Sequence, residues 1–405
     1  MIAHPWGRPA RIILAATLAA SALILGGSYG PAHAATSVAC SATDLQTAAS
    51  AGGDYVFAAN CSLTLSSPIT VSGQTFSLDA NGYSVTLDGN HTSQLFSIGS
   101  GSTVTLTGLT LQNGSASGGG TIHNTGGSHL TVAHDTFTGN IATGGLGGAI
   151  DNGNNNSSSD GNGDVLTVTG STFDNNSAGN GFGGAIENFC GNCTETIANS
   201  TFVGNTAGAG GGAVGNALGT TAFIYNSTVA DNTGSNGILN SSGTLTIANT
   251  LLANNTGPSC GAGTINDQGY NLQYPRGATA DTSCGFSTAK HDQFGDPHLA
   301  ATLANNGGPT ETLAVDTTGA AYNNGNPSVC AAAPVNRVDQ RGDARGTTCT
   351  IGAFEPQSGS SGCVTNCSTA TPELGSGELL ATGLLPLGAV LLYRRRRTRR
   401  ATQQQ

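Results

Sequence analysis

The sequence predicts an all-β fold in which short strands wind into a parallel β-helix, and three observations lead to this expectation. The chain of 405 residues contains 62 glycines and only 9% charged residues, a composition that suits neither helical bundles nor coiled coils. Short runs alternate apolar and small polar residues with a period of two, which is the period of a β-strand. Two phrases also recur through the middle of the chain, as they do in repeat proteins.

The first repeated phrase joins a Thr-Phe pair to an asparagine three residues after the phenylalanine. It occurs in 132–142, 168–178 and 197–207. We expect its asparagines to stack from coil to coil in a ladder, because piled amide side chains hydrogen-bond to one another and to turn backbone. The members of this ladder are Asn140, Asn176 and Asn205.

The second phrase has the pattern Gly-Gly-x-Ile-x-Asn, with Val in place of Ile in its last copy. It occupies 119–124, 147–152, 183–188 and 211–216. Three short strands separated by Gly or Asn then make one coil, and the glycines allow the tight corners. Stacked at about 4.8 Å per coil, residues 62–273 predict about eight or nine coils and a rod of roughly 40 Å.

The distribution of charge excludes one class of partner. No Lys or Arg lies between Ala35 and Pro275. A chain of this kind has no surface for phosphate backbones, so we expect no nucleic-acid binding. An acidic polysaccharide is also a poor partner unless a bound cation bridges the two.

The N-terminus has the features of a secretory signal. Arg8 and Arg11 precede an apolar run over 12–26, and Ala32-His33-Ala34 supplies the small residues of a cleavage site. We therefore expect residues 1–34 to be a signal peptide and the mature chain to begin at Ala35. A retained membrane anchor is the alternative.

All ten cysteines follow this predicted cleavage site. An even number of cysteines in an exported chain favours disulfides, and the short spacings suggest that neighbours pair, although spacing does not fix the connectivity. The expected pairs are Cys40–Cys61, Cys190–Cys193, Cys260–Cys284, Cys330–Cys349 and Cys363–Cys367. The Cys-x-x-Cys spacing at 190–193 leaves a redox or zinc role as an alternative.

The C-terminus predicts a membrane anchor. A linker over 357–377 leads to residues 378–405, in which an apolar helix precedes an Arg-rich stop that stays on the cytoplasmic side. The order of these parts resembles the surface-sorting signals of bacterial proteins. Leu379–Gly383 is similar to a sortase box, and Pro372–Leu374 is similar to the motif of exosortase-type tails. This resemblance implies a sorting enzyme as a partner.

The repeats themselves resemble a known group. The Ser-Thr-Phe-x-x-Asn and Gly-Gly-x-Ile-x-Asn units resemble the right-handed parallel β-helix repeats of bacterial surface proteins, including polymorphic outer-membrane protein repeats. The segment after them resembles the choice-of-anchor Q domain, although it departs from that family at 319–325. The motifs that carry this second resemblance are Asp296-Pro297, Asn306–Leu313, Asp339–Arg345 and Ile351–Glu355.

The resemblance implies an organisation and a location. Residues 35–275 form the β-helix with its N-terminal cap, and residues 276–356 form a choice-of-anchor Q-like C-terminal cap. We expect ion pairs to hold this cap, between Arg337, Arg341 and Arg345 and the acids Asp339, Asp343 and Glu355. The family's role is display at the cell surface, and no catalytic residue is carried over from it.

One group of residues is a candidate site. His123, Asp151 and Glu187 occupy the same position in three successive repeats, each directly after an inward Ile, so they are expected to point outward in a column. Two adjacent carboxylates raise the pKa of one of them or recruit a cation such as calcium, with the histidine as a further ligand. The alternative is a solvated column whose charges are screened by water.

Asp151 and Glu187 are also the candidate catalytic residues if the chain is a carbohydrate-active enzyme, either a glycan lyase or a glycoside hydrolase. The lyase chemistry lacks its base, because the solenoid has no Lys or Arg. The chain's one Trp is Trp6, in the signal segment, so stacking on sugars must come from Tyr and Phe. Outward threonines such as Thr103, Thr105 and Thr107 are not expected to form rows across coils.

These observations favour an exported bacterial surface protein, adhesin-like or structural, without catalytic activity and without a bound cofactor. Its expected partners are a polysaccharide or protein of the cell envelope or extracellular medium, and the membrane through the C-terminal tail.

Overall fold

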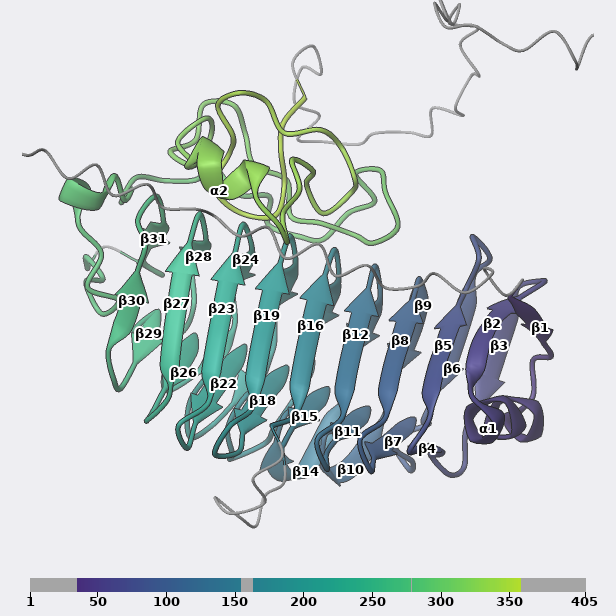
Figure 1. The fold of residues 1–405 in the computed structure, drawn as a ribbon. Helices are drawn as coiled ribbons and strands as arrows, with labels where there is room; N and C mark the ends of the chain where they lie inside the picture. The colour runs from purple at the N-terminus through teal and green to yellow at the C-terminus, as the bar shows by residue number, and fades with distance from the viewer. Residues whose placement is uncertain (1–34, 154–162, 278, 358–405) are drawn as a thin grey trace, which may run out of the picture. The chain divides into compact units, whose positions relative to one another are not determined.

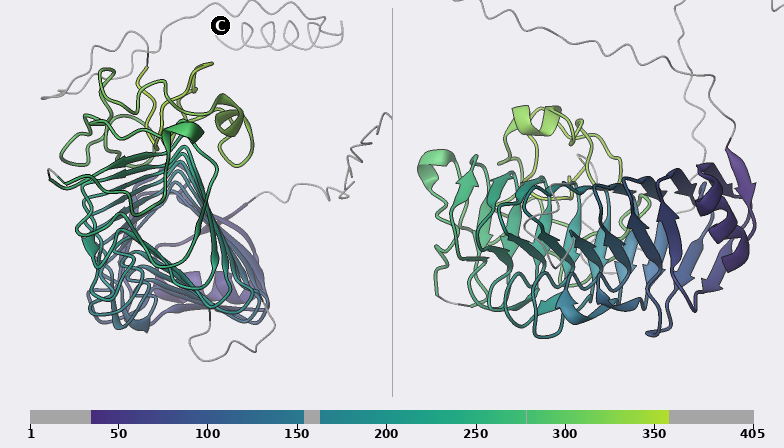
Figure 2. Two further views of the ribbon diagram at one scale, coloured as in Figure 1. Left: turned by 90° about the vertical axis from the view of Figure 1, so that its left-hand side faces the viewer. Right: turned by 60° about the horizontal axis from the view of Figure 1, so that its bottom comes forward.

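The structure is a computed structural model that describes residues 35–153, 163–277 and 279–357. In these residues the fold is the predicted parallel β-helix (Figure 1). Three parallel sheets of ten, nine and eight strands wind around a common axis, in agreement with the expected number of coils. Viewed along the axis the sheets form a triangle, so each coil turns three corners (Figure 2).

We call the three sheets A, B and C. Sheet A consists of β1 (Thr36–Val38), β2 (Gly53–Phe57), β5 (Thr75–Asp79), β8 (Thr103–Thr107), β12 (His129–Ala133), β16 (Val165–Thr169), β19 (Thr194–Ala198), β23 (Thr221–Tyr225), β27 (Thr244–Ala248) and β30 (Ile265–Asp267). Sheet B consists of β3 (Cys61–Thr64), β6 (Val85–Asp88), β9 (Leu109–Gln112), β13 (Thr136–Thr138), β17 (Thr172–Asp174), β20 (Thr201–Val203), β24 (Thr228–Ala230), β28 (Leu251–Ala253) and β31 (Leu272–Tyr274).

The third side has a main sheet and two small ones. Sheet C consists of β4 (Ile69–Ser72), β7 (Phe96–Gly99), β11 (Ile122–Asn124), β15 (Ile150–Asn152), β18 (Ile186–Phe189), β22 (Val214–Ala217), β26 (Ile238–Asn240) and β29 (Cys260–Gly261). Two further pairs precede strands of sheet C: β10 (Ser115–Gly118) with β14 (Ile141–Leu146), and β21 (Thr206–Ala207) with β25 (Thr233–Gly234).

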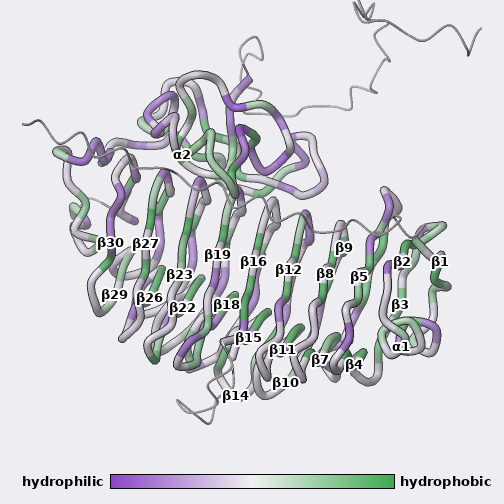
Figure 3. Tube along the Cα trace, in the orientation of Figure 1, coloured by the Kyte–Doolittle hydropathy of each residue, from purple (hydrophilic) through white to green (hydrophobic). Residues whose placement is uncertain are grey.

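The alternation of residues places the core inside the triangle. In β8, for example, Val104 and Leu106 are fully buried, while Thr103, Thr105 and Thr107 are more exposed. Figure 3 shows apolar residues alternating with more polar ones along such strands. The repeated phenylalanines stack on one another inside, with ring centroids 4.6 Å apart for Phe137 and Phe173 and 4.7 Å apart for Phe173 and Phe202. This core runs through all the coils and stabilises the rod by burying apolar surface.

The predicted asparagine ladder is confirmed and is longer than expected. Asn140 Nδ2 donates to Asn176 Oδ1 at 2.8 Å, and Asn176 Nδ2 donates to Asn205 Oδ1 at 2.9 Å. Asn232 and Asn255 extend the ladder by two coils. A second buried ladder, which we did not predict, runs through the strands of sheet C, at the corner toward sheet A. Its members are Asn124, Asn152, Asn188, Asn216 and Asn240.

The N-terminal end of the solenoid is covered by helix α1 (Ala42–Ala51). Ser41 caps the helix by accepting from the backbone N–H of Asp44. The side chain of Gln46 accepts from the backbone N–H of Thr70 and donates to its carbonyl, so the helix satisfies one residue of the free edge of β4. The Cys40–Cys61 disulfide holds this cap to sheet B. An exposed strand edge is an aggregation hazard, and α1 covers part of this edge at β4.

The C-terminal end is covered by the chain around the short helix η1 (Thr288–Lys290). The Cys260–Cys284 disulfide ties this chain to β29, and Phe286 is buried in the core of the solenoid. Gln293 pairs with β31 through backbone hydrogen bonds to Asn271 and Gln273.

The remainder of the predicted cap, residues 296–357, lies elsewhere than expected. This segment, which contains α2 (Pro327–Ala331), packs along the outer face of sheet B and not on the end of the rod (Figures 1 and 2). The reason is that the outer face of sheet B turns apolar in the last coils. The buried residues that meet there are Ala230, Leu251, Ala253 and Leu272 from the solenoid and Leu313, Val315, Ala321, Ile351 and Phe354 from the segment.

Ion pairs fix this side segment, as predicted for two of the three arginines. Arg341 pairs with Asp339 at 2.7 Å and with Asp343 at 3.1 Å. The buried Arg345 pairs with Glu355 at 3.2 Å and also donates to Asn199 Oδ1 in the solenoid.

Four of the five expected disulfides are present, namely Cys40–Cys61, Cys190–Cys193, Cys260–Cys284 and Cys330–Cys349. The pair Cys363–Cys367, the signal segment 1–34, the linker from residue 358 on and the anchor 378–405 lie outside the described residues. Within the described part of the chain, no helix has the length and apolar character needed to span a membrane.

Candidate functional site

The three candidate residues share one position in successive coils, as the repeat alignment predicts. His123 of β11 pairs in register with Asp151 of β15, which pairs with Glu187 of β18. The isoleucine before each of them is fully buried inside the solenoid, so the column lies on the outer side of sheet C.

The two carboxylates are buried, although they point away from the core. Asp151 is 0% exposed and Glu187 is 1% exposed, so the alternative of a solvated column does not hold for these two residues. The Gly-Gly turns that precede each strand fold back closely over the column. A Cβ on Gly147 would lie 2.8 Å from the backbone nitrogen of Asp151, and one on Gly183 would lie 2.8 Å from Cα of Glu187.

The histidine and the aspartate form a pair. His123 Nε2 lies 3.5 Å from Asp151 Oδ2 and 3.1 Å from the carbonyl oxygen of Gly153. Burial lowers the pKa of His123, and the hydrogen bond to Gly153 opposes this shift only in part. A neutral imidazole protonated at Nε2 therefore donates to the Gly153 carbonyl at neutral pH.

Glu187 leans away from this pair. Its Oε2 occupies the place where residue 215 of the next coil would carry a Cβ, and Gly215 leaves that place free. No hydrogen bond satisfies this oxygen among the described residues. Burial raises the pKa of Glu187 well above its usual value, and the charges of Asp151 and Glu195 raise the pKa further. Such surroundings favour the protonated form of this carboxyl.

The predicted three-ligand metal site is therefore not assembled in this geometry. Among the described residues, the one group of three His, Cys, Asp or Glu ligand atoms within 4.8 Å of one another is Asp164, Cys190 and Cys193. The column brings His123 and Asp151 together, with the carbonyl of Gly153, but it does not bring Glu187 to them. Calcium at this column remains a prediction.

The close fit of Glu187 over Gly215 gives a testable prediction. Gly215→Ala is expected to destabilise the protein by about 1–3 kcal/mol, the usual cost of overpacking, because the new methyl group overlaps the carboxyl. Glu187→Ala should suppress most of this effect in the double variant. Equilibrium unfolding of the two single variants and the double variant gives their coupling energy. Additive effects would show that Glu187 does not lie over Gly215.

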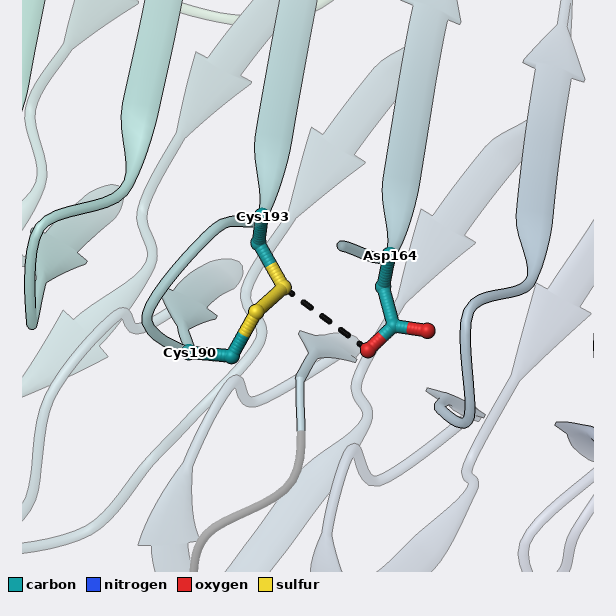
Figure 4. A group of neighbouring side chains, drawn as sticks. All are labelled: Asp164, Cys190 and Cys193. Carbon is teal, nitrogen blue, oxygen red and sulfur yellow. Dashed lines mark hydrogen bonds between the residues drawn. A yellow bond between two sulfur atoms is a disulfide. The ribbon is translucent and has the colours of Figure 1, made fainter. Parts of the chain in front are cut away.

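The group of Asp164, Cys190 and Cys193 lies at the corner between sheets C and A (Figure 4). The two sulfurs are bonded to each other, so in this form neither is a thiolate that could bind zinc. Asp164 Oδ1 accepts from the backbone N–H groups of Gly127 and Ser128. Its Oδ2 lies 3.7 Å from Cys193 Sγ. These contacts give the aspartate a structural role in holding the corner.

Sequence reasoning missed a buried acid on the inner side of sheet A. Glu195 pairs in register with Leu166 on one side and Ala222 on the other, and both of these residues are in the core. The glutamate is fully buried, and neither of its carboxyl oxygens has a hydrogen-bond partner among the described residues. Burial raises its pKa to about 8. The alternation in 194–198 contained the signal, since it places residue 195 at an inward position.

The outer face of sheet A carries a feature that the sequence analysis did not expect. The expectation that outward threonines do not form rows is wrong. The hydroxyl side chains of five successive coils lie in register along this face. They are Ser77, Thr105, Thr131, Thr167 and Thr196. The row was missed because the repeat units were aligned on their Phe and Asn residues and not on the preceding strand.

The fold and these surfaces define the class of the chain as a parallel β-helix protein. Comparison with known proteins adds no family, because no family model, no curated protein and no solved structure matches the chain.

Proposed function

We propose that the protein is an exported, adhesin-like module that displays its β-helix at a bacterial cell surface and has no catalytic activity. The observation that carries this proposal is the open outer face of sheet A. Figure 1 shows this face toward the viewer, and no described segment lies across its middle. The side segment covers sheet B instead, through the buried cluster that contains Leu251 and Phe354. A long rod with one face left open suits recognition of an extended partner.

Two sets of observations support export and anchoring. Four disulfides staple the described part of the chain, which is usual for proteins that fold outside the cytoplasm. The signal-like residues 1–34 and the apolar and Arg-rich residues 378–405 fit a chain that is exported and then held at the surface, with a sorting enzyme as a possible partner. The resemblance of 296–355 to the choice-of-anchor Q domain supports the same location.

The enzyme alternative gains little support from the geometry. A glycan-cleaving pair must touch the scissile bond, whereas Asp151 and Glu187 are 0% and 1% exposed beneath the Gly-Gly turns. Burial favours the protonated form of Glu187, but it also keeps this carboxyl out of contact with a polysaccharide.

The location can be tested with the single lysine of the chain. The side chain of Lys290 is half-exposed, and its Nζ lies 3.3 Å from Asp267 Oδ2. A membrane-impermeant amine reagent should label the full-length protein on intact cells. Lys290→Arg keeps the charge and should remove this labelling, which controls for reaction at the N-terminal amine. Labelling of Lys290 only after the cells are lysed would contradict surface display.

A further inference from the structure

The outer face of sheet A carries no charged side chain from β8 to β27, apart from a histidine. Each of these six strands presents three outward residues, and none of them is Asp, Glu, Lys or Arg. The outward residues are Thr103, Thr105, Thr107, His129, Thr131, Ala133, Val165, Thr167, Thr169, Thr194, Thr196, Ala198, Thr221, Phe223, Tyr225, Thr244, Thr246 and Ala248. A chain with a strongly acidic balance thus leaves one long face neutral, which selects against ionic partners.

The hydroxyl groups on this face are regularly spaced. Neighbouring strands lie about 4.7–4.9 Å apart, and outward residues of one strand are about 6.6–6.8 Å apart. The in-register pairs Thr105–Thr131 and Thr131–Thr167 place donors and acceptors on this grid. Each threonine hydroxyl both donates and accepts a hydrogen bond, so the face can bond to the hydroxyl groups of a partner without any charge.

Two aromatic side chains interrupt the grid near its C-terminal end. Phe223 and Tyr225 both point outward from β23, with ring centroids 6.2 Å apart and ring planes 17° apart. Phe223 lies in register between Thr196 and Thr246. Both rings are partly exposed and their planes are nearly parallel, so they form an apolar platform among hydroxyl groups.

Small residues make room for this platform. Tyr225 lies in register between Ala198 and Ala248, and both alanines are fully buried. The Tyr225 ring is therefore flanked by short side chains on both neighbouring strands. An apolar ring face surrounded by hydroxyl groups matches the chemistry of a pyranose, which has an apolar C–H face and a rim of hydroxyl groups.

We propose that Phe223 and Tyr225, with the threonines beside them, bind a neutral polysaccharide chain along the outer face of sheet A. This inference rests on the proposed adhesin-like function and names its ligand class. The ring faces stack on sugar rings, and the partly exposed Thr196 and Thr221 hydrogen-bond to sugar hydroxyls. An uncharged lattice such as ice is the other partner for a threonine grid, but the two rings break the flat array that a rigid lattice needs.

The test uses the purified full-length protein, so its result does not depend on where the cell places the protein. Soluble glucan, mannan and galactan are compared with the carboxymethyl derivative of each. We expect binding of at least one neutral polymer, with weaker binding of its charged derivative and little change with salt concentration. The double variant Phe223→Ser, Tyr225→Ser should weaken this binding by roughly tenfold or more.

Phe294→Ser is the matched control, because it removes another exposed ring outside this face and should leave binding unchanged. Circular dichroism checks that each variant is folded. The proposal is overturned if no neutral polymer binds, if the double variant binds as tightly as the wild type, or if the carboxymethyl derivative binds better. Incorporation of the protein into growing ice without binding to any polymer would assign the face to ordered water instead.

Discussion

Glu195→Gln is expected to stabilise the protein strongly at pH 8 and hardly at all at pH 4. In the folded state the glutamate lies in the core between Leu166 and Ala222, and burial raises its pKa to about 8, from an ordinary value of 4.5. Below pH 4.5 the carboxyl is protonated in both the folded and the unfolded state, so burial of its charge costs nothing there. Between pH 4.5 and 8 the unfolded chain releases the proton and the folded chain keeps it.

The folded state therefore binds more protons in this window, and its stability falls as the pH rises. The loss is about 1.4 kcal/mol per pH unit and reaches an upper limit of roughly 5 kcal/mol near pH 8. Glutamine has nearly the same shape and no titration, so it removes the loss. Asp135 is buried and its pKa is also raised to about 8, so the Glu195→Gln variant keeps the part of the pH dependence that Asp135 causes.

Thermal unfolding followed by circular dichroism at pH 4 and pH 8 checks this result. Glu311→Gln serves as the control, because Glu311 is exposed and its side chain makes no hydrogen bond in the described structure. The difference in midpoint between Glu195→Gln and the wild type should be large at pH 8 and small at pH 4. An equal difference at both values would mean that the carboxyl is not buried as a protonated acid.

Asn176→Ala is expected to cost roughly 2–6 kcal/mol, because four buried hydrogen bonds are lost at about 0.5–1.5 kcal/mol each. Asn176 Oδ1 accepts from both the backbone N–H and the Nδ2 of Asn140. Its Nδ2 donates to the carbonyl of Phe137 at 3.1 Å and to Oδ1 of Asn205 at 2.9 Å. Alanine leaves these groups without that partner, in a corner that excludes water.

Equilibrium unfolding in denaturant measures this cost. Asn180→Ala is the matched control, since Asn180 is exposed and its side chain makes no hydrogen bond in the described part of the chain. We expect the control to change stability by less than about 0.5 kcal/mol. If Asn176→Ala and Asn180→Ala proved equally mild, the ladder would not contribute to stability as the geometry indicates.

The fold was predictable because the repeated phrases mark equivalent positions in successive coils. The Thr-Phe and Gly-Gly phrases recur at the same place in each coil, so aligning them aligns the coils. Asn140, Asn176 and Asn205 were placed correctly for this reason, and so was the column of His123, Asp151 and Glu187, which the structure puts in register.

The burial of that column could not be predicted in the same way. The alternation places Asp151 on the outer side of its strand, but the turn that covers it follows from how closely glycine backbone can approach. The position of residues 296–357 depends on the apolar outer face of β28, where Leu251 and Leu252 are adjacent and one of them must point outward. Two successive leucines were a readable signal that sheet B is covered there.

The central claim is that function lies on the open face of sheet A and not at the buried carboxylates. It is tested most directly by comparing two double variants of the full-length protein on the polysaccharide that the wild type retains. One is Phe223→Ser, Tyr225→Ser, and the other is Asp151→Asn, Glu187→Gln. Retention and newly formed reducing or unsaturated ends are measured together. We predict that the first variant loses retention, that the second keeps it, and that no new ends form. New ends in the wild type that disappear in the carboxylate variant would show an enzyme and contradict the claim.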